Sequence, residues 1–324
     1  MIEKIDELKQ MIDESKTIAL FAHINPDGDA IGSILAMKTY LDSLGKDTYV
    51  FLQEPISQNY RFSGIHDVAN KRQLSEYDLA FCLDCPHTKR FGEWEQEFYK
   101  AKRTIKIDHH IAEEKVADLE FIDTEICSVC EFIYKIFKQM GVKITPKIAT
   151  YLYNGIATDT GGFLHGNHGE VTADTWKAVA DLVECGADLE TVNYNIFIKT
   201  TKNVFELNKE VLQRVEFYAD GKIAMVCLPN SVLQETGTDL YDTHKFLDDF
   251  TGIEGVEILA FMTQVKDNEN AVSIRSRTKN AQRICKHFGG GGHLRASGCR
   301  IFVPLQVAKS LLLEECKKEL YRND

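Results

Sequence analysis

The chain has 324 residues, a formal net charge of -11 at pH 7, 44% hydrophobic residues and 27% charged residues. This composition is that of an ordinary globular protein with room for two domains, and it excludes a disordered or fibrous chain. The acidic balance argues against generic binding to long duplex nucleic acid, whose proteins usually present a large positive surface.

The N-terminus, residues 1–14, has the pattern of an acidic amphipathic helix and lacks the basic start and apolar core of a signal peptide. No apolar run in the sequence approaches the roughly 18 residues that a membrane span needs. We therefore expect a cytoplasmic protein that has no membrane partner.

The first strand is expected at residues 17–22, and a helix is expected at residues 30–44. His23, Asp27 and Asp29 fall on the loop between them. Open α/β sheets place their ligand sites at the carboxyl ends of strands. One imidazole and two carboxylates within seven residues of such a loop indicate a metal site in outline.

The alternation of strands and helices continues to about residue 190. Strands are expected at 47–52, 77–83 and 103–107, and helices are expected to end at 140, to span 146–158 and to span 172–185. This order predicts a mostly parallel sheet with helices on both faces. Asp84 follows one of these strands, Asp108-His109-His110 follow another, and Asp159 ends a helix.

Nine cysteines, an odd number scattered along the chain, favour reduced thiols over a disulfide framework. Cys82-x-x-Cys85 and Cys127-x-x-Cys130 together imitate a four-thiolate zinc site. However, Cys82 lies in an apolar run, and Ser128 begins a capping box that opens a helix. Buried free thiols are the favoured interpretation, and structural zinc remains the alternative.

The pattern changes in the last third of the chain. Residues 194–218 are predicted to form a polar helical connector. Beyond it we expect strands at 222–228, 256–265 and 271–275, helices at 281–288 and 304–321, and a hairpin turn at 267–270. The predicted organisation is an α/β domain over 1–193, a helical linker over 194–218 and a smaller α+β domain over 219–324.

Six groups that bind hard or borderline metals lie at element ends. They are His23, Asp27, Asp29, Asp84, His109 and Asp159. Six exceed what one divalent ion takes from protein while it keeps water and substrate, so two ions that share a bridging carboxylate fit better. Such a centre activates water and clamps the attacking and leaving oxygens of a phosphoryl transfer. The nearby His87, His165 and His168 are not expected as ligands.

A run of four glycines, Gly289–Gly292, precedes His293. Consecutive glycines let the backbone approach an anion and turn several N–H groups toward it, as in a phosphate nest. Arg275 and Arg277 supply further phosphate donors, and no acidic residue occurs between positions 269 and 314. A flexible linker is the alternative interpretation of the glycines, which the flanking strand, helix and basic residues disfavour.

Together these motifs resemble the DHH phosphoesterase superfamily with its associated C-terminal domain, and the resemblance spans nearly the whole chain. The motifs are His23-x-Asn-Pro-Asp27-Gly-Asp29, Asp84, Asp108-His109-His110, Asp159 and Gly289-Gly-Gly-Gly-His293. Within the superfamily, the two-domain length and the segment Ser273-Ile-Arg275-Ser-Arg277 are most similar to the nanoRNase A type, which comprises bifunctional oligoribonucleases and pAp phosphatases.

The resemblance implies two divalent ions, with manganese as the expected metal. One ion would be held by His23, Asp27 and Asp84, and the other by Asp29, Asp84, His109 and Asp159. Asp108 would orient the ring of His109, and His110 would face the scissile phosphate as donor or general acid. The substrate's terminal phosphate or nucleotide would be held in a cleft between the domains by Gly290, Gly291, Gly292, His293, Arg275 and Arg277.

The activity that the resemblance implies is hydrolysis of short oligoribonucleotides to mononucleotides, and of 3'-phosphoadenosine 5'-phosphate (pAp) to AMP, by a hydroxide that two metal ions activate. The expected partners are short RNA and small phosphorylated nucleotides, with a homodimer as one candidate assembly. The nearest alternative is hydrolysis of linear or cyclic dinucleotides such as pApA and cyclic di-AMP. A catalytically silent nucleotide-binding regulator is the alternative from another class, which the complete ligand set disfavours.

Two departures from the family pattern concern substrate preference more than the ligand set. Residues 111–114 read Ile-Ala-Glu-Glu where the family often has an Asn. Residues 127–130 read Cys-Ser-Val-Cys where a helix usually begins Ser-Ser-Thr.

Overall fold

The computed structural model describes residues 2–111, 114–164, 171–247, 250 and 252–322. The chain divides into two compact units, Met1–Lys199 and Thr200–Asp324. Each unit has its own sheet and two hydrophobic cores of its own. None of the helices in the described ranges has the length and apolarity of a membrane span.

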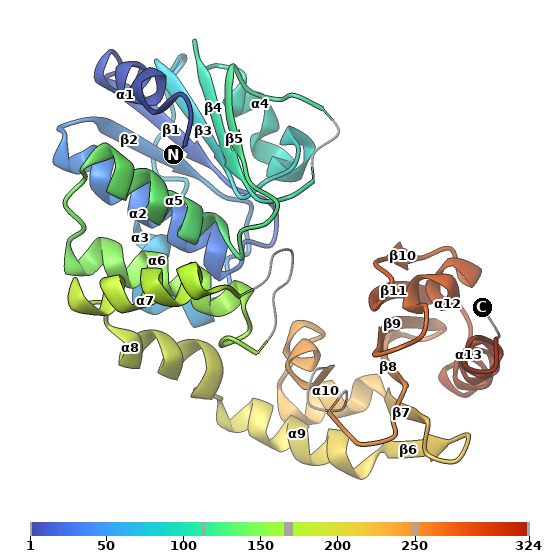
Figure 1. Ribbon diagram of the computed structural model, residues 1–324. Helices are drawn as coiled ribbons and strands as arrows, with labels where there is room; N and C mark the ends of the chain where they lie inside the picture. Colours follow the sequence, from blue (N-terminus) through green and yellow to red (C-terminus); the bar gives the residue numbers. More distant parts are fainter. Residues whose placement is uncertain (1, 112–113, 165–170, 248–249, 251, 323–324) are drawn as a thin grey trace. The chain divides into compact units, whose positions relative to one another are not determined.

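The first unit is built on a five-stranded sheet in the order β2-β1-β3-β4-β5, and all neighbouring strands are parallel. Its strands are β1 (Thr17–Phe21), β2 (Asp47–Phe51), β3 (Leu79–Leu83), β4 (Thr104–Asp108) and β5 (Leu119–Ile122). The chain runs from β1 to one side of the sheet and then crosses to the other side, so the strand order reverses beside β1 (Figure 1). Ligand sites of open α/β sheets lie at such a switch point.

Helices cover both faces of this sheet, as the sequence predicts (Figure 1). Ile18 and Leu20 of β1 face the large core that includes α2 (Gly28–Ser43) and α5 (Val129–Met140). Ala19 and Phe21 face a smaller aromatic core on the other side, which contains residues of η2 and α4. Successive side chains of β1 point to opposite faces of the sheet, and helical elements cover both faces. The strand is therefore apolar on both faces.

The remaining helical elements of the first unit are α1 (Ile5–Asp13), η1 (Gln58–Ser63), α3 (Ile65–Val68), η2 (Thr88–Trp94), α4 (Glu95–Phe98), α6 (Pro146–Asp159), α7 (Ala173–Glu184), α8 (Leu189–Asn193) and η3 (Tyr194–Ile198). Helices α2 and α6 approach closely because glycines lie between them. A Cβ at Gly32 would lie 2.4 Å from the carbonyl oxygen of Tyr151, and one at Gly155 would lie 2.4 Å from Oδ1 of Asp29. This packing brings Asp29 and Asp159, which lie on different helices, toward the same place.

The second unit contains a six-stranded mixed sheet in the order β10-β11-β9-β8-β7-β6. Its strands are β6 (Val215–Tyr218), β7 (Ile223–Leu228), β8 (Ile258–Lys266), β9 (Glu269–Ser276), β10 (Gly291–Gly292) and β11 (Ala296–Ile301), and its helical elements are α9 (Lys202–Gln213), α10 (Asn230–Thr236), η4 (Tyr241–Phe246), α12 (Ala281–His287) and α13 (Leu305–Leu320). The hairpin between β8 and β9 is confirmed, with a turn at residues 267 and 268. The α/β first unit and α+β second unit match the predicted fold class.

The prediction of a helical connector over residues 194–218 is wrong at its end. Val215–Tyr218 forms the edge strand β6, which pairs antiparallel with β7. The segment reads Val-Glu-Phe-Tyr and can alternate its side chains across a sheet, and the partner strand decides this conformation. Helix α9 also belongs to the second unit, where Val204, Leu207 and Val211 pack in a core.

Candidate metal centre

The strand ends of the first unit bring together the charged residues singled out in the sequence. His23 lies two residues beyond β1, Asp84 directly follows β3, and Asp108–His110 end and follow β4. Asp29 lies in the first turn of α2, and Asp159 is the last residue of α6. Because β1, β3 and β4 are neighbours in the sheet, these loops meet at one edge.

Three groups of side chains in the described part of the chain are close enough to hold a metal ion. They are His23, Asp27 and Asp84; Asp29, His109 and Asp159; and Asp84, His109 and His110. Within each group, the ligand atoms all lie within 4.8 Å of one another. All six predicted ligands are present, and His110, which the sequence placed only beside the substrate, also falls in a group. We call the six predicted ligands the metal centre.

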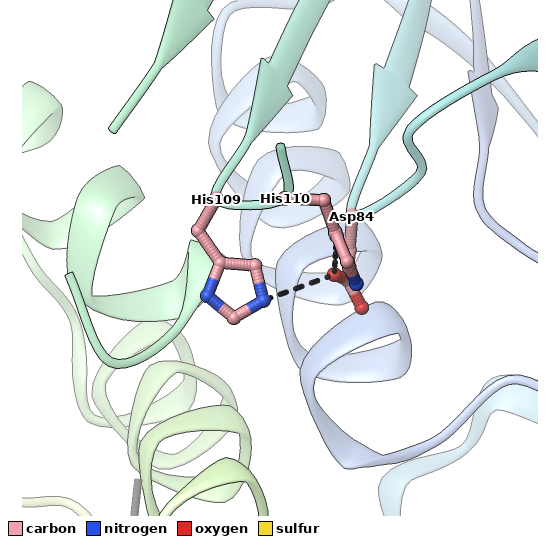
Figure 2. Close-up of side chains that lie close together, drawn as sticks. All are labelled: Asp84, His109 and His110. Atoms are coloured by element: carbon pink, nitrogen blue, oxygen red, sulfur yellow. Dashed lines mark ion pairs between the residues drawn. The ribbon is translucent and has the colours of Figure 1, made fainter. Parts of the chain in front are cut away.

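Asp84 occupies the middle of the metal centre. Its Oδ2 lies 3.4 Å from Nε2 of His23, and its Oδ1 lies 3.6 Å from Nε2 of His109. Figure 2 shows the side chains of His109 and His110 both directed at the Asp84 carboxylate, with dashed lines for the ion pairs. His109 Nε2 also lies 3.4 Å from Oδ2 of Asp159. The two oxygens of Asp84 thus face different histidines, which is the arrangement that a bridging carboxylate requires.

The backbone at Asp84 has a φ of 53°, in the left-handed region that residues with a side chain rarely adopt. Such conformations cost on the order of 1–3 kcal/mol and persist where the surrounding structure imposes them, often at functional sites. The side chain of Asp84 is buried. The sequence around Asp84 does not predict this backbone conformation.

The backbone fixes the orientation of both predicted histidine ligands. Nδ1 of His23 lies 2.7 Å from the carbonyl oxygen of Ile24, and Nδ1 of His109 lies 3.4 Å from that of Ile126. In each case a proton on Nδ1 leaves Nε2 directed at the carboxylates, as a metal-binding imidazole requires. Burial lowers the pKa of His109, which favours the neutral form that binds metals.

Helix N-termini hold two of the carboxylates. Asp27 is the N-cap of α2, and its Oδ1 accepts hydrogen bonds from the N–H groups of Asp29 and Ala30. Asp29 is fully buried, and its oxygens accept hydrogen bonds from the N–H groups of Val129 and Cys130 at the start of α5, at 2.6 and 2.8 Å. The positive end of a helix dipole stabilises a carboxylate in this position. The segment that departs from the family pattern thus still holds Asp29.

The contacts of Asp108 differ from those expected. Its Oδ1 accepts hydrogen bonds from Nδ1 of His110 at 2.8 Å and from the backbone N–H of His109 at 2.9 Å. The predicted contact with the ring of His109 is therefore replaced by one with the ring of His110. The cause is the chain direction after β4, which turns the His109 ring toward Ile126 and Asp159.

Sequence reasoning missed one residue beside the metal centre, Lys106. Its side chain is completely buried, and its Nζ lies 3.2 Å from Oδ2 of Asp108 and 2.8 Å from the carbonyl oxygen of Pro86. A lysine in the strand Thr-Ile-Lys-Ile-Asp is the signal that could have revealed it, because a charged residue is almost never buried without a partner. Lys106 joins the loop after β3 to the end of β4.

Without bound cations, the crowded and buried carboxyl groups of the metal centre disfavour one another's ionised forms. Burial, with the charges of Asp84 and Asp27, raises the pKa of Asp29 well above its usual range. Burial raises the pKa of Asp159 likewise, and the neighbouring carboxylates add to the effect. For His23, burial opposes protonation, but Asp27 and Asp84 prevail and raise the pKa to about 11. Hard oxygen donors with imidazoles around a shared carboxylate fit divalent cations.

The cysteine pairs are not arranged as a zinc site. The metal-competent groups in the described ranges contain no cysteine. Cys82 and Cys85 lie in the small aromatic core, whereas Cys127 and Cys130 lie in the large core on the other face of the sheet. His165 and His168 lie outside the described residues.

In the second unit, the predicted phosphate-binding residues lie on or next to β9 and β10, which are separated by β11. Arg275 is in β9 and is paired in register with Ala296 of β11, which in turn pairs with β10. Arg277 and His293 are exposed. The structure thus places Arg275 on the same sheet as the glycines.

The glycine segment, which we define as Gly289–Gly292, is less open than a phosphate nest. The N–H groups of Gly289, Gly290 and His293 all donate to backbone carbonyl oxygens of the same unit. Gly291 and Gly292 form β10 and pair with β11. Two N–H groups of the glycine run that the sequence assigned to a phosphate, those of Gly289 and Gly290, are therefore already used.

Close packing against the neighbouring backbone is a second reason for glycine at these positions. A Cβ at Gly290 would lie 2.3 Å from the carbonyl oxygen of Gly298, and a Cβ at Gly292, whose φ is 140°, would lie 2.7 Å from that of Ala296. A Cβ at Gly291 would meet nothing within 4 Å. Glycine is thus sterically required at two positions of the segment and not at the position between them.

Comparison with known proteins identifies both units. The sequence profile of the DHH family, N-terminal domain, matches residues 17–156, and that of the DHHA1 domain matches residues 222–318. The chain is 29% identical over 302 residues to the bifunctional oligoribonuclease and PAP phosphatase NrnA of Bacillus subtilis, covering 91% of this chain and 93% of the relative.

Two further relatives also span nearly the whole chain. Uncharacterized protein MG371 of Mycoplasma genitalium is 30% identical over 301 residues, which cover 90% of this chain and 89% of the relative. The crystal structure of an exopolyphosphatase-related protein of Bacteroides fragilis matches with a TM-score of 0.88 at 25% identity, and covers 97% of this chain and 95% of that chain.

Proposed function

Because this chain belongs to the DHH family and carries the DHHA1 domain, we propose that it hydrolyses short oligoribonucleotides to mononucleotides and pAp to AMP. The name of the Bacillus subtilis relative states oligoribonuclease and PAP phosphatase activities for that protein. The observation that carries the proposal is the position of Asp84, whose two oxygens face His23 and His109 in the middle of a buried acidic cluster.

The metal centre has the donors for two divalent cations, and manganese is the proposed metal. His23, Asp27 and Asp84 would hold one ion. The other would be held by Asp29, Asp84, His109 and Asp159. When bound, two such ions supply a water nucleophile at neutral pH and stabilise the charge on the phosphoryl oxygens.

His110 is the proposed proton donor to the leaving oxygen. Its Nδ1 is hydrogen-bonded to Asp108, which holds the ring in one orientation and assigns proton transfer to Nε2. Asp108 in turn lies beside the buried ammonium group of Lys106. With Lys106 and His110 around it, Asp108 keeps a pKa below its usual value in spite of its burial, so it stays ionised and can stabilise a protonated His110.

The second unit is proposed to hold the phosphate at the end of the substrate. Arg275, Arg277 and His293 supply side-chain donors, and Gly290, Gly291 and Gly292 let the substrate approach the backbone. A guanidinium group can donate to two phosphate oxygens at once. The N–H groups already used within the unit leave the side chains with most of this task.

A substrate panel tests the proposal. Manganese-loaded protein and protein treated with a chelator are offered end-labelled RNAs of two to seven nucleotides, pAp, pApA and cyclic di-AMP, and kcat/KM is compared because specificity is a ratio of these values. We expect metal-dependent release of mononucleotides from the shortest RNAs and of AMP from pAp. A dominant activity on cyclic di-AMP would replace the proposal with a cyclic dinucleotide phosphodiesterase. Binding without hydrolysis of any substrate would favour a silent regulator.

A further inference from the structure

A hollow of about 730 Å³ opens beside the metal centre within the first unit. We call it the side hollow, and the residues that line it include Pro86, His87, Lys89, Tyr99, Ile111 and Lys115. Pockets for small ligands usually have volumes of roughly 300–1,000 Å³. The side hollow is therefore large enough for a nucleoside, and it is not formed by any of the six predicted metal ligands.

Two chain segments lead directly from the metal centre into the side hollow. Pro86 lies two residues after Asp84, and Ile111 follows His110. Consecutive Cα atoms are about 3.8 Å apart, so these walls begin within about 8 Å of residues in the centre. A group attached to a phosphate that is bound at Asp84 and His110 can reach the hollow.

Tyr99 presents a fixed aromatic surface in the side hollow. The hydroxyl of Thr88 donates to Oε1 of Glu95, so the Tyr99 hydroxyl donates to Thr88 Oγ1, at 2.8 Å. The ring also packs edge-on against Phe98, with 5.7 Å between ring centroids. Nevertheless 58% of Tyr99 is exposed. An anchored but exposed ring is suited to stacking with a nucleic acid base, which depends on the ring face and not on base identity.

The other lining residues suit a nucleoside with one phosphodiester. Ile111 is 84% exposed and offers a second apolar side chain. Among the lining residues that the structure describes, Lys89 and Lys115 are exposed, and Glu95 and Glu114 offset their charges. A balanced hollow does not favour a highly charged ligand such as pyrophosphate, whereas a base, a ribose and one phosphate are compatible with it.

One wall of the side hollow is fixed before a ligand arrives. The carbonyl oxygen of Pro86 accepts a hydrogen bond from the buried Nζ of Lys106, which also lies 3.2 Å from Asp108. The wall and the residue that orients His110 are thus joined through one side chain. Such preorganisation reduces the entropy lost when a ligand binds.

From these contacts we infer that the side hollow binds the second nucleoside of an oligonucleotide, the one attached beyond the scissile phosphate, with its base stacked on Tyr99. The inference rests on the proposed function and specifies which part of the substrate the first unit recognises. It also distinguishes the two proposed substrates. A dinucleotide such as pApA has a second nucleoside, whereas pAp has no group attached beyond its scissile 3'-phosphate.

The test compares these two substrates on the manganese-loaded protein with both units present. We expect Tyr99→Ala to lower kcat/KM for pApA by about tenfold, which is within the range measured for the loss of one base-stacking contact. The same variant should hydrolyse pAp at the wild-type rate. Tyr99→Phe retains the ring and should keep most of the pApA activity. Tyr194→Ala removes a tyrosine of similar exposure, 53%, that does not line the hollow, and should change neither activity.

Each outcome decides the inference. An unchanged kcat/KM for pApA in Tyr99→Ala, or an equal fall for pApA and pAp, would overturn it. If the wild-type protein hydrolyses neither substrate, the proposed function fails, and the hollow is then judged by equilibrium binding. In that experiment, Tyr99→Ala should weaken the binding of pApA and not that of pAp. Equal pApA affinities in the variant and the wild type would reject the hollow as a nucleoside site. Thermal unfolding of each variant checks that the fold is intact.

Discussion

The metal centre and the glycine segment were the two strongest motifs in the sequence, and they work in different ways. In the metal centre, Asp29, Asp84 and His109 are buried and crowded, so their chemistry depends on side chains held against electrostatic repulsion. In the glycine segment, the decisive feature is the absence of a side chain, because Gly290 lies against the backbone of β11.

The two regions differ in how clearly their sequence motifs indicate a function. A buried cluster of carboxylates and imidazoles has few explanations other than a cation, because its charges cost free energy when they are left alone. A glycine run has at least two explanations, an anion site and close packing. In this protein, the steric contacts of Gly290 and Gly292 explain part of the run before any ligand is considered. The predictions below test the two regions separately.

The largest effect is expected from Asp84→Asn in the metal centre. The amide keeps the size of the side chain but removes the charge that both predicted ions share. We expect kcat to fall by about a thousandfold or more for every substrate, since metal ions contribute several kcal/mol to such reactions. Single-turnover hydrolysis of RNA and of pAp, with circular dichroism to check the fold, measures this. Activity near that of the wild type would mean that catalysis does not need Asp84. The proposed contrast between the metal centre and the glycine segment would then be wrong.

Lys106→Met is expected to have the next largest effect, because it breaks a buried ion pair and leaves the charge of Asp108 without its partner. Such changes cost about 3–5 kcal/mol in unfolding free energy. We expect chemical denaturation to show this loss, and kcat to fall more than KM changes. Lys106→Arg keeps the charge and serves as the control for it. If the methionine variant were as stable as wild type, the pair with Asp108 would not hold the end of β4.

In the glycine segment, the contrast between two neighbouring substitutions separates packing from phosphate binding. Gly290→Ala should destabilise the second unit by about 1–3 kcal/mol, because its Cβ would overlap the backbone of Gly298 and Cys299. Gly291→Ala has open space and should unfold like wild type. A fall in pAp affinity in the stable Gly291→Ala variant would support an anion site at the segment. Equal stability of the two variants would contradict the packing explanation.

The sequence predicted elements with a clear periodicity well. The parallel order of the first unit follows from strands such as β1 and β3, which are apolar on both faces and are followed by helices. β5 was missed because it is short, and β11 was missed because it is rich in small and polar residues. Such segments form strands only because a neighbouring strand pairs with them, and that information is not local.

The same limit applies to the metal centre. Motif spacing singled out the six predicted ligands, because His23, Asp84 and His109 follow neighbouring strands of a parallel sheet and therefore lie at one edge. It could not show that Asp108 contacts His110, since that depends on how the chain turns after β4. Nor could it reveal that Lys106 is buried, because a lysine in a strand is normally assigned to a solvent-facing position.

The smallest effect expected is a gain in stability from Asp159→Asn in the metal-free protein. Burial and neighbouring carboxylates raise the pKa of Asp159 in the folded state. A group whose folded pKa is raised stabilises the fold at low pH, and this stabilisation is lost as the pH rises through the folded pKa. At neutral pH, the metal-free wild-type protein should therefore be less stable than the variant by about 1 kcal/mol, or about 2–4 °C in Tm.

The pH and metal dependence of this difference separate electrostatics from packing. The advantage of Asp159→Asn should shrink as the pH falls toward the unfolded pKa of aspartate, about 3.9, because the wild-type carboxyl is then protonated. Manganese should reverse the order, since the ion stabilises the folded wild type and displaces protons from its ligands. Scanning calorimetry across pH, with and without manganese, measures both effects. If the gain in stability depended on neither pH nor manganese, Asp159 would destabilise the metal-free protein through poor packing and not through repulsion between carboxylates.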